Sequence, residues 1–144
     1  MDLRYVIHLS GKPNWVIAAT DTYVGAPVVL RNKDNVDQSL YVWTFQSEDN
    51  SIALASTSNN VVLDGQSLTD NTNIVLAAYN GSGSATATQQ WKFDAPYLRN
   101  VTNASYVIDN YGGYLTDGNN IIVFQFNGRA SSQQWELSPY DSFK

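Results

Sequence analysis

A motif of two glutamines and a tryptophan occurs twice in this chain, and it constrains the fold more than any other feature. Gln89-Gln90-Trp91 and Gln133-Gln134-Trp135 are complete copies, while Tyr41-Val42-Trp43 keeps only the tryptophan. The tryptophans at positions 43, 91 and 135 are 48 and 44 residues apart. Self-similarity at a period of about 20 to 50 residues indicates an architecture of repeated units. The sequence therefore predicts three units of one design, which we call lobes one, two and three.

Further segments repeat in the same order ahead of each tryptophan. An apolar triplet comes first and is followed by a small or acidic residue; the three copies are Trp15–Ala18, Val61–Asp64 and Tyr106–Asp109. A second apolar triplet comes next; its copies are Val28–Leu30, Ile74–Leu76 and Ile121–Val123. In lobes two and three this triplet leads on to an Asn-Gly pair, at positions 80 and 127. A shared order of this extent predicts that the three lobes fold alike.

The composition is that of a folded globular protein. With 144 residues, of which 43% are hydrophobic and 15% charged, the chain has the length of one domain and enough apolar side chains for one core. We expect a single domain over residues 1–144, with lobes at about 1–47, 48–94 and 95–144. The net charge of −5 is unlike the basic clusters that bind nucleic acid, and it disfavours anionic membranes. No cysteine is present, so we expect neither disulfides nor a thiolate metal site, and no cofactor.

The first residues carry an expectation about location. Met1–His8 has neither a basic leader nor an apolar run of the length that a signal peptide needs. No segment approaches the roughly 20 apolar residues that span a bilayer. We therefore expect a cytoplasmic protein without membrane insertion, which would reach the outside only by a non-classical route of release.

The apolar runs are typical of strands. They are short, rich in Val, Ile, Tyr and Phe, and separated by Gly, Asn, Asp, Ser and Thr. We predict four strands per lobe, at residues 4–9, 15–19, 27–32 and 41–46, then 51–55, 61–65, 74–79 and 90–94, then 97–101, 106–110, 121–126 and 134–138. Twelve short strands in a threefold repeat predict an all-β fold, the β-trefoil, with Trp43, Trp91 and Trp135 in a shared core.

The sequence offers little material for catalysis. Its single histidine, His8, lies in an apolar strand, so Ser/His/acid and Cys/His constellations are hard to build, and no metal-ligand spacing occurs. Asp64 and Asp109 are singled out by the repeat, but paired glycosidase carboxyls lie only about 5 to 9.5 Å apart. Equivalent positions on separate lobes should lie further apart than this. We therefore expect a protein that is not an enzyme.

The same two aspartates suit a polyol ligand. Each ends a strand before a turn rich in Gly and Asn, where an exposed carboxylate accepts strong hydrogen bonds from neighbouring hydroxyls. In lobe three, Phe124 offers an aromatic face to the C–H side of a sugar ring, and Asn127 adds an amide. An acid, a ring and an amide around a shallow site predict a neutral sugar as the ligand. The structural alternative, in which the aspartate caps a turn and the phenylalanine fills the core, stays open.

These repeats resemble those of the ricin-type (R-type) lectins, β-trefoil sugar-binding modules with a Gln-x-Trp repeat. The resemblance covers nearly the whole chain, and the lack of cysteine is similar to that of fungal and bacterial members. It implies ligands of the galactose or N-acetylgalactosamine type, as carried by glycoproteins and glycolipids. The residues that match the family's binding positions are Asp109, Phe124, Asn127 and Gln133 in lobe three, and Asp64 and Asn80 in lobe two.

The lobes differ in how well they match this pattern. In lobe two Ala77 stands at the aromatic position, with only Tyr79 nearby, and in lobe one Ala18, Arg31 and Asp34 replace the Asp, the aromatic and the Asn. We predict the best site in lobe three, a weaker one in lobe two and none in lobe one. Single shallow sites bind weakly, so avidity would need two sites or a homo-oligomer. A loop-based module, such as a protease inhibitor or a toxin's targeting subunit, is the alternative that the same fold allows.

Overall fold

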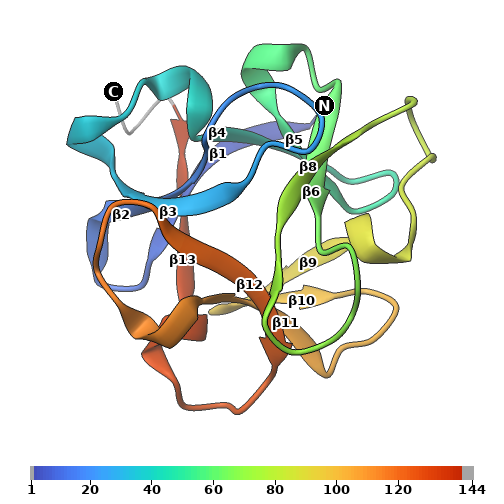
Figure 1. The fold of residues 1–144 in the computed structure, drawn as a ribbon. Helices are drawn as coiled ribbons and strands as arrows, with labels where there is room; N and C mark the ends of the chain where they lie inside the picture. Colours follow the sequence, from blue (N-terminus) through green and yellow to red (C-terminus); the bar gives the residue numbers. More distant parts are fainter. Residues whose placement is uncertain (1, 141–144) are drawn as a thin grey trace.

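The computed structural model describes residues 2–140, which form thirteen short strands (Figure 1). Lobe one contains β1 (Leu3–Leu9), β2 (Lys12–Ala19), β3 (Val28–Asn32) and β4 (Val42–Gln46). Lobe two contains β5 (Ser51–Leu54), β6 (Val61–Asp64), β7 (Thr72–Asn73), β8 (Val75–Ala78) and β9 (Trp91–Asp94). Lobe three contains β10 (Tyr97–Asn100), β11 (Tyr106–Asn110), β12 (Asn119–Gln125) and β13 (Trp135–Pro139). The predicted strands are present to within about three residues, except that the third strand of lobe two is divided.

Ile74 explains this division. It lies between β7 and β8, is fully buried, and uses its backbone to join the hairpins of the other two lobes. Its carbonyl accepts the N–H of Val28 at 3.0 Å, and its N–H donates to the carbonyl of Ile121 at 2.9 Å. Because β7 also pairs with β12, the turn before it in lobe two lies beside lobe three.

The connections contain single turns of 3-10 helix. Among residues 2–140 these are η1 (Lys33–Asn35), η2 (Gln38–Leu40), η3 (Ala55–Thr57), η4 (Ala87–Gln89), η5 (Tyr111–Gly113) and η6 (Ser131–Gln133). Side chains cap the first two, since Asn32 accepts the N–H of Asp34 and Asp37 accepts that of Ser39. Within this part of the chain, no helix has the length and apolar character to cross a membrane.

Strand pairing repeats with threefold symmetry. The middle strands of each lobe form a hairpin, in which β2 pairs with β3, β6 with β8, and β11 with β12. The last strand of each lobe pairs with the first strand of the next, so that β4 pairs with β5, β9 with β10, and β13 with β1. Figure 1 shows the three lobes around a common centre, with lobe one in blue, lobe two in green and lobe three in orange. The predicted all-β trefoil is confirmed.

The three tryptophans lie in one core, as predicted. Trp43, Trp91 and Trp135 are at most 1% exposed and pack with the inward-facing branched residues of all three lobes. The indole N–H groups of Trp43 and Trp135 donate to the carbonyls of Ile17 and Ile108, both at 3.0 Å. The indole N–H of Trp91 is buried without a hydrogen-bond partner. The threefold symmetry of the core is therefore broken in lobe two.

Candidate functional site

Three of the four lobe-three residues selected from the sequence lie around one hollow, and Gln133 does not line it. Asp109 at the end of β11, Phe124 on β12 and Asn127 in the following turn all line it. Its volume is about 330 Å³. The other lining residues are Asn71, Tyr111, Gly112, Tyr114, Ile122, Ala130 and Ser132. The fold thus brings the acid, the ring and the amide together, while their role in binding stays a prediction.

Asp109 is the buried acid of this hollow. Only 6% of the residue is exposed, so the expectation of an exposed carboxylate is wrong: η6 packs against the end of β11 and covers it. Its Oδ2 accepts a hydrogen bond from Nε2 of Gln133 at 3.0 Å, whereas its Oδ1 is buried and accepts none. Burial raises the pKa of Asp109, and the contacts with Gln133 and Ser132 offset only part of this rise. Asp109 therefore lines the hollow as a nearly buried carboxyl group, with the side chain of Ser132 beside it.

The Gln-x-Trp motif holds this carboxylate in place. Gln133 is fully buried, and its Nε2 donates both to Asp109 and to the carbonyl of Gln125 at 2.9 Å. Its Oε1 accepts the N–H of Asn127 at 3.2 Å. Two residues further on, the indole of Trp135 binds the carbonyl just before Asp109. Both N–H groups of the Gln133 amide are used within the protein, so this predicted binding residue positions the site.

Phe124 and Asn127 complete the hollow with complementary chemistry. Phe124 is half-buried, opposite Val107 in the β11–β12 hairpin. Asn127 is exposed, and its Oδ1 accepts the N–H groups of Arg129 at 3.0 Å and Ala130 at 2.9 Å. These bonds fix the side chain and leave its amide N–H groups available as donors. Phe124 thus gives the hollow an apolar face, and Asn127 gives it a pair of donors.

In lobe two the matching carboxylate is already occupied. Oδ1 of Asp64 accepts the N–H of Gln66 and the hydroxyl of Thr88, both at 2.7 Å, and its Oδ2 accepts Nε2 of Gln89 at 3.1 Å. The first of these bonds depends on a tight turn in which Gln66 takes a φ of 63°. Asp64 therefore caps its own turn, which is the structural alternative that the sequence left open.

The other predicted parts of the lobe-two site do not gather around Asp64. Asn80 is exposed, and its backbone N–H donates to the hydroxyl of Ser84 at 3.2 Å. The hydroxyl of Tyr79 donates to Asp49 at 2.7 Å, so its ring does not take the place of the aromatic that Ala77 lacks. None of the hollows described here is lined by both Asp64 and Asn80.

Lobe one has no equivalent site. Ala18, at the position of the aspartate, is fully buried. Arg31, at the aromatic position, donates from Nε to Asp117 at 3.0 Å and from Nη2 to the carbonyl of Asn35 at 2.8 Å. Its side chain therefore joins lobe one to lobe three.

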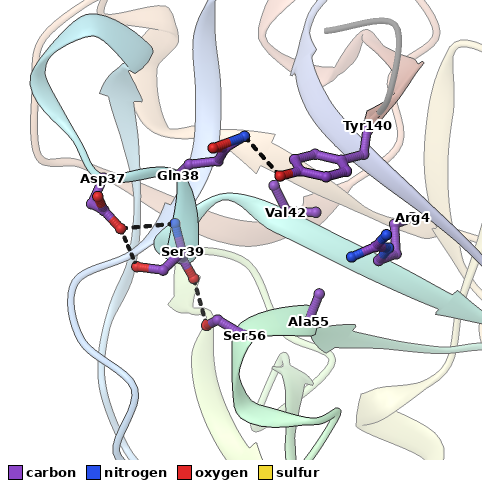
Figure 2. Close-up of a pocket in the computed structure, with 8 residues that line it drawn as sticks. All are labelled: Arg4, Asp37, Gln38, Ser39, Val42, Ala55, Ser56 and Tyr140. Carbon is purple, nitrogen blue, oxygen red and sulfur yellow. Dashed lines mark hydrogen bonds between the residues drawn. The ribbon is translucent and has the colours of Figure 1, made fainter. Parts of the chain in front are cut away.

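A second groove, of about 380 Å³, is larger but chemically different (Figure 2). Its lining residues are Arg4, Asp37, Gln38, Ser39, Val42, Ala55, Ser56 and Tyr140. Figure 2 shows hydrogen bonds among most of its polar groups, Arg4 excepted: Gln38 donates to the Tyr140 hydroxyl at 3.0 Å, and Ser56 donates to the carbonyl of Ser39 at 2.7 Å. No lining atom of this groove is buried without a hydrogen-bond partner in the part of the chain described. The lobe-three hollow is therefore the stronger candidate.

His8 joins strands and lies away from both hollows. Its ring nitrogens bond the carbonyl of Leu9 at 3.0 Å and the hydroxyl of Ser138 at 2.9 Å, and Nδ1 lies 3.8 Å from Glu136. Ser138 and Glu136 both stand on β13, which pairs with β1, and neither lines a hollow described here. No three His, Cys, Asp or Glu side chains among residues 2–140 are placed to hold a metal ion.

Comparison with known proteins gives structural likeness alone. No protein-family model and no curated protein matches the sequence. The C-half of the earthworm R-type lectin in complex with GalNAc matches with a TM-score of 0.75 at 11% identity, over 95% of this chain and 98% of that one. The β-trefoil lectin of the Vibrio vulnificus hemolysin/cytolysin, with N-acetyl-D-lactosamine bound, matches with a TM-score of 0.69 at 15% identity, over 96% and 95%.

The chain has the β-trefoil fold of the R-type lectins. A mosquitocidal holotoxin also matches, with a TM-score of 0.75 at 22% identity. The match covers 96% of this chain and only 17% of the holotoxin chain.

Several lining residues were missed from the sequence. Tyr111, Gly112 and Tyr114 follow Asp109 closely, so two aromatics around a Gly-Gly pair were a visible signal at the end of the site strand. Asn71 reaches the hollow from lobe two, where the N–H of Asn71 donates to the carbonyl of Val123 at 2.9 Å. No local sequence pattern indicates that a residue of one lobe lines a hollow of the next.

Proposed function

We propose that this chain is a non-catalytic lectin that binds galactose-type or N-acetylgalactosamine-type glycans in the lobe-three hollow. The observation that carries the proposal is that Asp109, Phe124 and Asn127 line one hollow, which brings an acid, an aromatic ring and an amide together. Asp109 is only 6% exposed, and leaving its Oδ1 without a hydrogen bond in this position costs about 1–3 kcal/mol.

The rest of the hollow supports a sugar over other polar ligands. Phe124 offers an apolar face, and galactose presents a matching patch of C–H groups beside its axial hydroxyl. Asn127 lines the same hollow and supplies amide donors for further sugar hydroxyls. The likeness to lectins solved with GalNAc and with N-acetyl-D-lactosamine supports the same class of sugar. Since each group binds and none is arranged as a nucleophile with a base, the proposed activity is recognition without turnover.

A glycan array on three proteins tests the proposal. Asp109→Ala should lose binding by about tenfold or more, the equivalent of about 1.4 kcal/mol. Asp64→Ala is the matched control, since it removes the same side chain from the equivalent place, and it should retain binding while losing stability. Far-UV circular dichroism confirms that each variant is folded. Full binding by Asp109→Ala would reject the site, and a folded wild type that binds no glycan would reject the lectin.

The holotoxin likeness favours a second candidate, a targeting module of a larger toxin that works through its loops. Such a module would bind its receptor equally well with Asp109→Ala, and free galactose would not compete. A lectin gives the opposite result in both measurements, so the two candidates are separated by one set of proteins.

A further inference from the structure

The lobe-three hollow has a second aromatic surface beside the first. Tyr111 and Tyr114 line the same hollow as Phe124. They are 47% and 60% exposed, and their ring centroids lie 6.5 Å apart at an interplanar angle of 46°. Exposed aromatic pairs are uncommon on a surface that has no ligand to meet, because burying them is favourable. We propose that the hollow recognises at least two linked sugar residues, with Tyr111 and Tyr114 as the platform for the second; this rests on the proposed function.

The turn that carries the two tyrosines is built to hold them. Gly112 and Gly113 take φ values of 63° and 74°, which L residues rarely adopt. A Cβ added at Gly112 would stand 2.4 Å from Cε2 of Tyr114, so the ring lies directly against the glycine. Only a Gly at this position allows the ring to rest there.

Two asparagine side chains, of which Asn110 is buried, hold both ends of this turn. Nδ2 of Asn110 donates to the carbonyl of Tyr114 at 3.0 Å, and Nδ2 of Asn119 donates to the carbonyl of Tyr111 at 2.8 Å. Asn119 also donates to Oδ1 of Asn110 at 2.7 Å, and Asn110 is fully buried. The platform is therefore held in place before a ligand arrives, which lowers the entropy that binding must remove.

The exposed fractions of the lining side chains increase from the interior of the hollow to its rim. Asp109 is 6% exposed, Phe124 is half-buried, and the tyrosines are the most exposed of the four. The first sugar is placed against Asp109 and Phe124, and the sugar linked to it lies over the tyrosines. The hollow's 330 Å³ lies at the lower end of the range for small-molecule sites of about 300–1,000 Å³.

The other lobes have no such platform beside an acid. Asp64 is followed by Gly65 and Gln66, with no aromatic in the turn. Lobe one has an exposed tyrosine, Tyr23, at 58% exposure, but Ala18 stands where the acid would be. The aromatic pair thus lies in the lobe whose aspartate, Asp109, lines a hollow.

Isothermal titration with methyl galactoside and with a panel of galactose-terminated disaccharides of different linkage tests the inference. At least one disaccharide should bind the wild type about tenfold more tightly than methyl galactoside. Tyr114→Ala should lower that affinity to the level of the monosaccharide and leave the monosaccharide unchanged. Tyr114→Phe, which keeps the ring, should retain most of the gain. Tyr23→Ala removes an equally exposed tyrosine and should change neither affinity.

Each other outcome overturns a stated step. If no disaccharide exceeds the monosaccharide, the second subsite does not exist. If Tyr114→Ala lowers both affinities alike, the tyrosines and Phe124 flank one ring, and the inference is wrong while the lectin proposal stands. If the folded wild type binds neither probe, the proposed function fails, and the inference fails with it. Asp109→Ala should lower both affinities by about tenfold or more, which separates loss of the first subsite from loss of the second.

Discussion

Replacing each core tryptophan by phenylalanine uses the molecule's own symmetry as the control. Trp43, Trp91 and Trp135 are equally buried, so each substitution removes a similar volume from the core. They differ in one respect. Trp43 and Trp135 each donate one hydrogen bond to a backbone carbonyl, whereas the N–H of Trp91 is buried and unpaired.

The difference in stability follows from these bonds. Trp43→Phe and Trp135→Phe each lose a hydrogen bond with a net worth of about 0.5–1.5 kcal/mol. Trp91→Phe loses no bond and removes a buried N–H whose burial costs about 1–3 kcal/mol. Because the cost of the cavity is the same in all three variants, Trp91→Phe should lower the free energy of unfolding by about 2 kcal/mol less than the other two substitutions. For a chain of this size that is a difference in Tm of on the order of 6 °C.

Urea unfolding followed by far-UV circular dichroism measures this, with the midpoint of each variant taken between its own folded and unfolded baselines. The m values should agree among the variants, because the surface exposed on unfolding is nearly unchanged. The reasoning is refuted if Trp91→Phe costs as much as Trp135→Phe. In that case the unpaired indole would carry no penalty, and packing alone would set the stability.

Three further predictions concern charge and the site. Asp109→Asn should stabilise the fold at pH 7 by about 1 kcal/mol, because burial raises the pKa of Asp109. The carboxyl group of Asp109 does not destabilise the wild type below the unfolded pKa near 3.8, and the wild type loses stability as pH rises through the folded pKa. Unfolding curves should therefore show that Asp109→Asn raises the free energy of unfolding more at pH 7 than at pH 3.5. Asp49→Ala should behave in the opposite way: burial acts to raise the pKa of Asp49, but hydrogen bonds from Ser51, Tyr79 and Ala85 together lower it. Its contribution is present above about 3.8 and is lost as pH falls through the folded pKa, so denaturant titrations should show a loss of about 2–3 kcal/mol at pH 7 that shrinks at lower pH. Asn71→Gly keeps the left-handed φ of 66° while removing the amide, and calorimetric titration should show weaker disaccharide binding with stability changed by less than about 1 kcal/mol.

The fold could be predicted from the sequence because the repeated residues are the ones that the core uses. The tryptophans and the apolar triplets recur at fixed places, and the three tryptophans and at least one residue of every triplet lie in one buried cluster. The division between β7 and β8 was not predictable, since it arises where Ile74 bonds with Val28 and Ile121 of other lobes. The sequence repeat shows which residues the lobes have in common, but it does not show which residues of different lobes are in contact.

The site was only partly predictable for a related reason. Asp64 and Asp109 have the same place in the repeat, yet only Asp109 keeps an oxygen without a donor. The difference depends on Gln66 adopting a φ of 63° and on the hydroxyl of Thr88 reaching Asp64. Neither can be read from the strand pattern, because both depend on how the turn after the strand closes.

Different residues surround Asp109 on its interior side and on its exposed side. Gln133 and Trp135 hold the acid from the interior side, whereas the segment from Tyr111 to Tyr114 is exposed and carries no core side chain. Substitutions at Tyr111 and Tyr114 therefore change the surface of the hollow while leaving the buried core side chains in place.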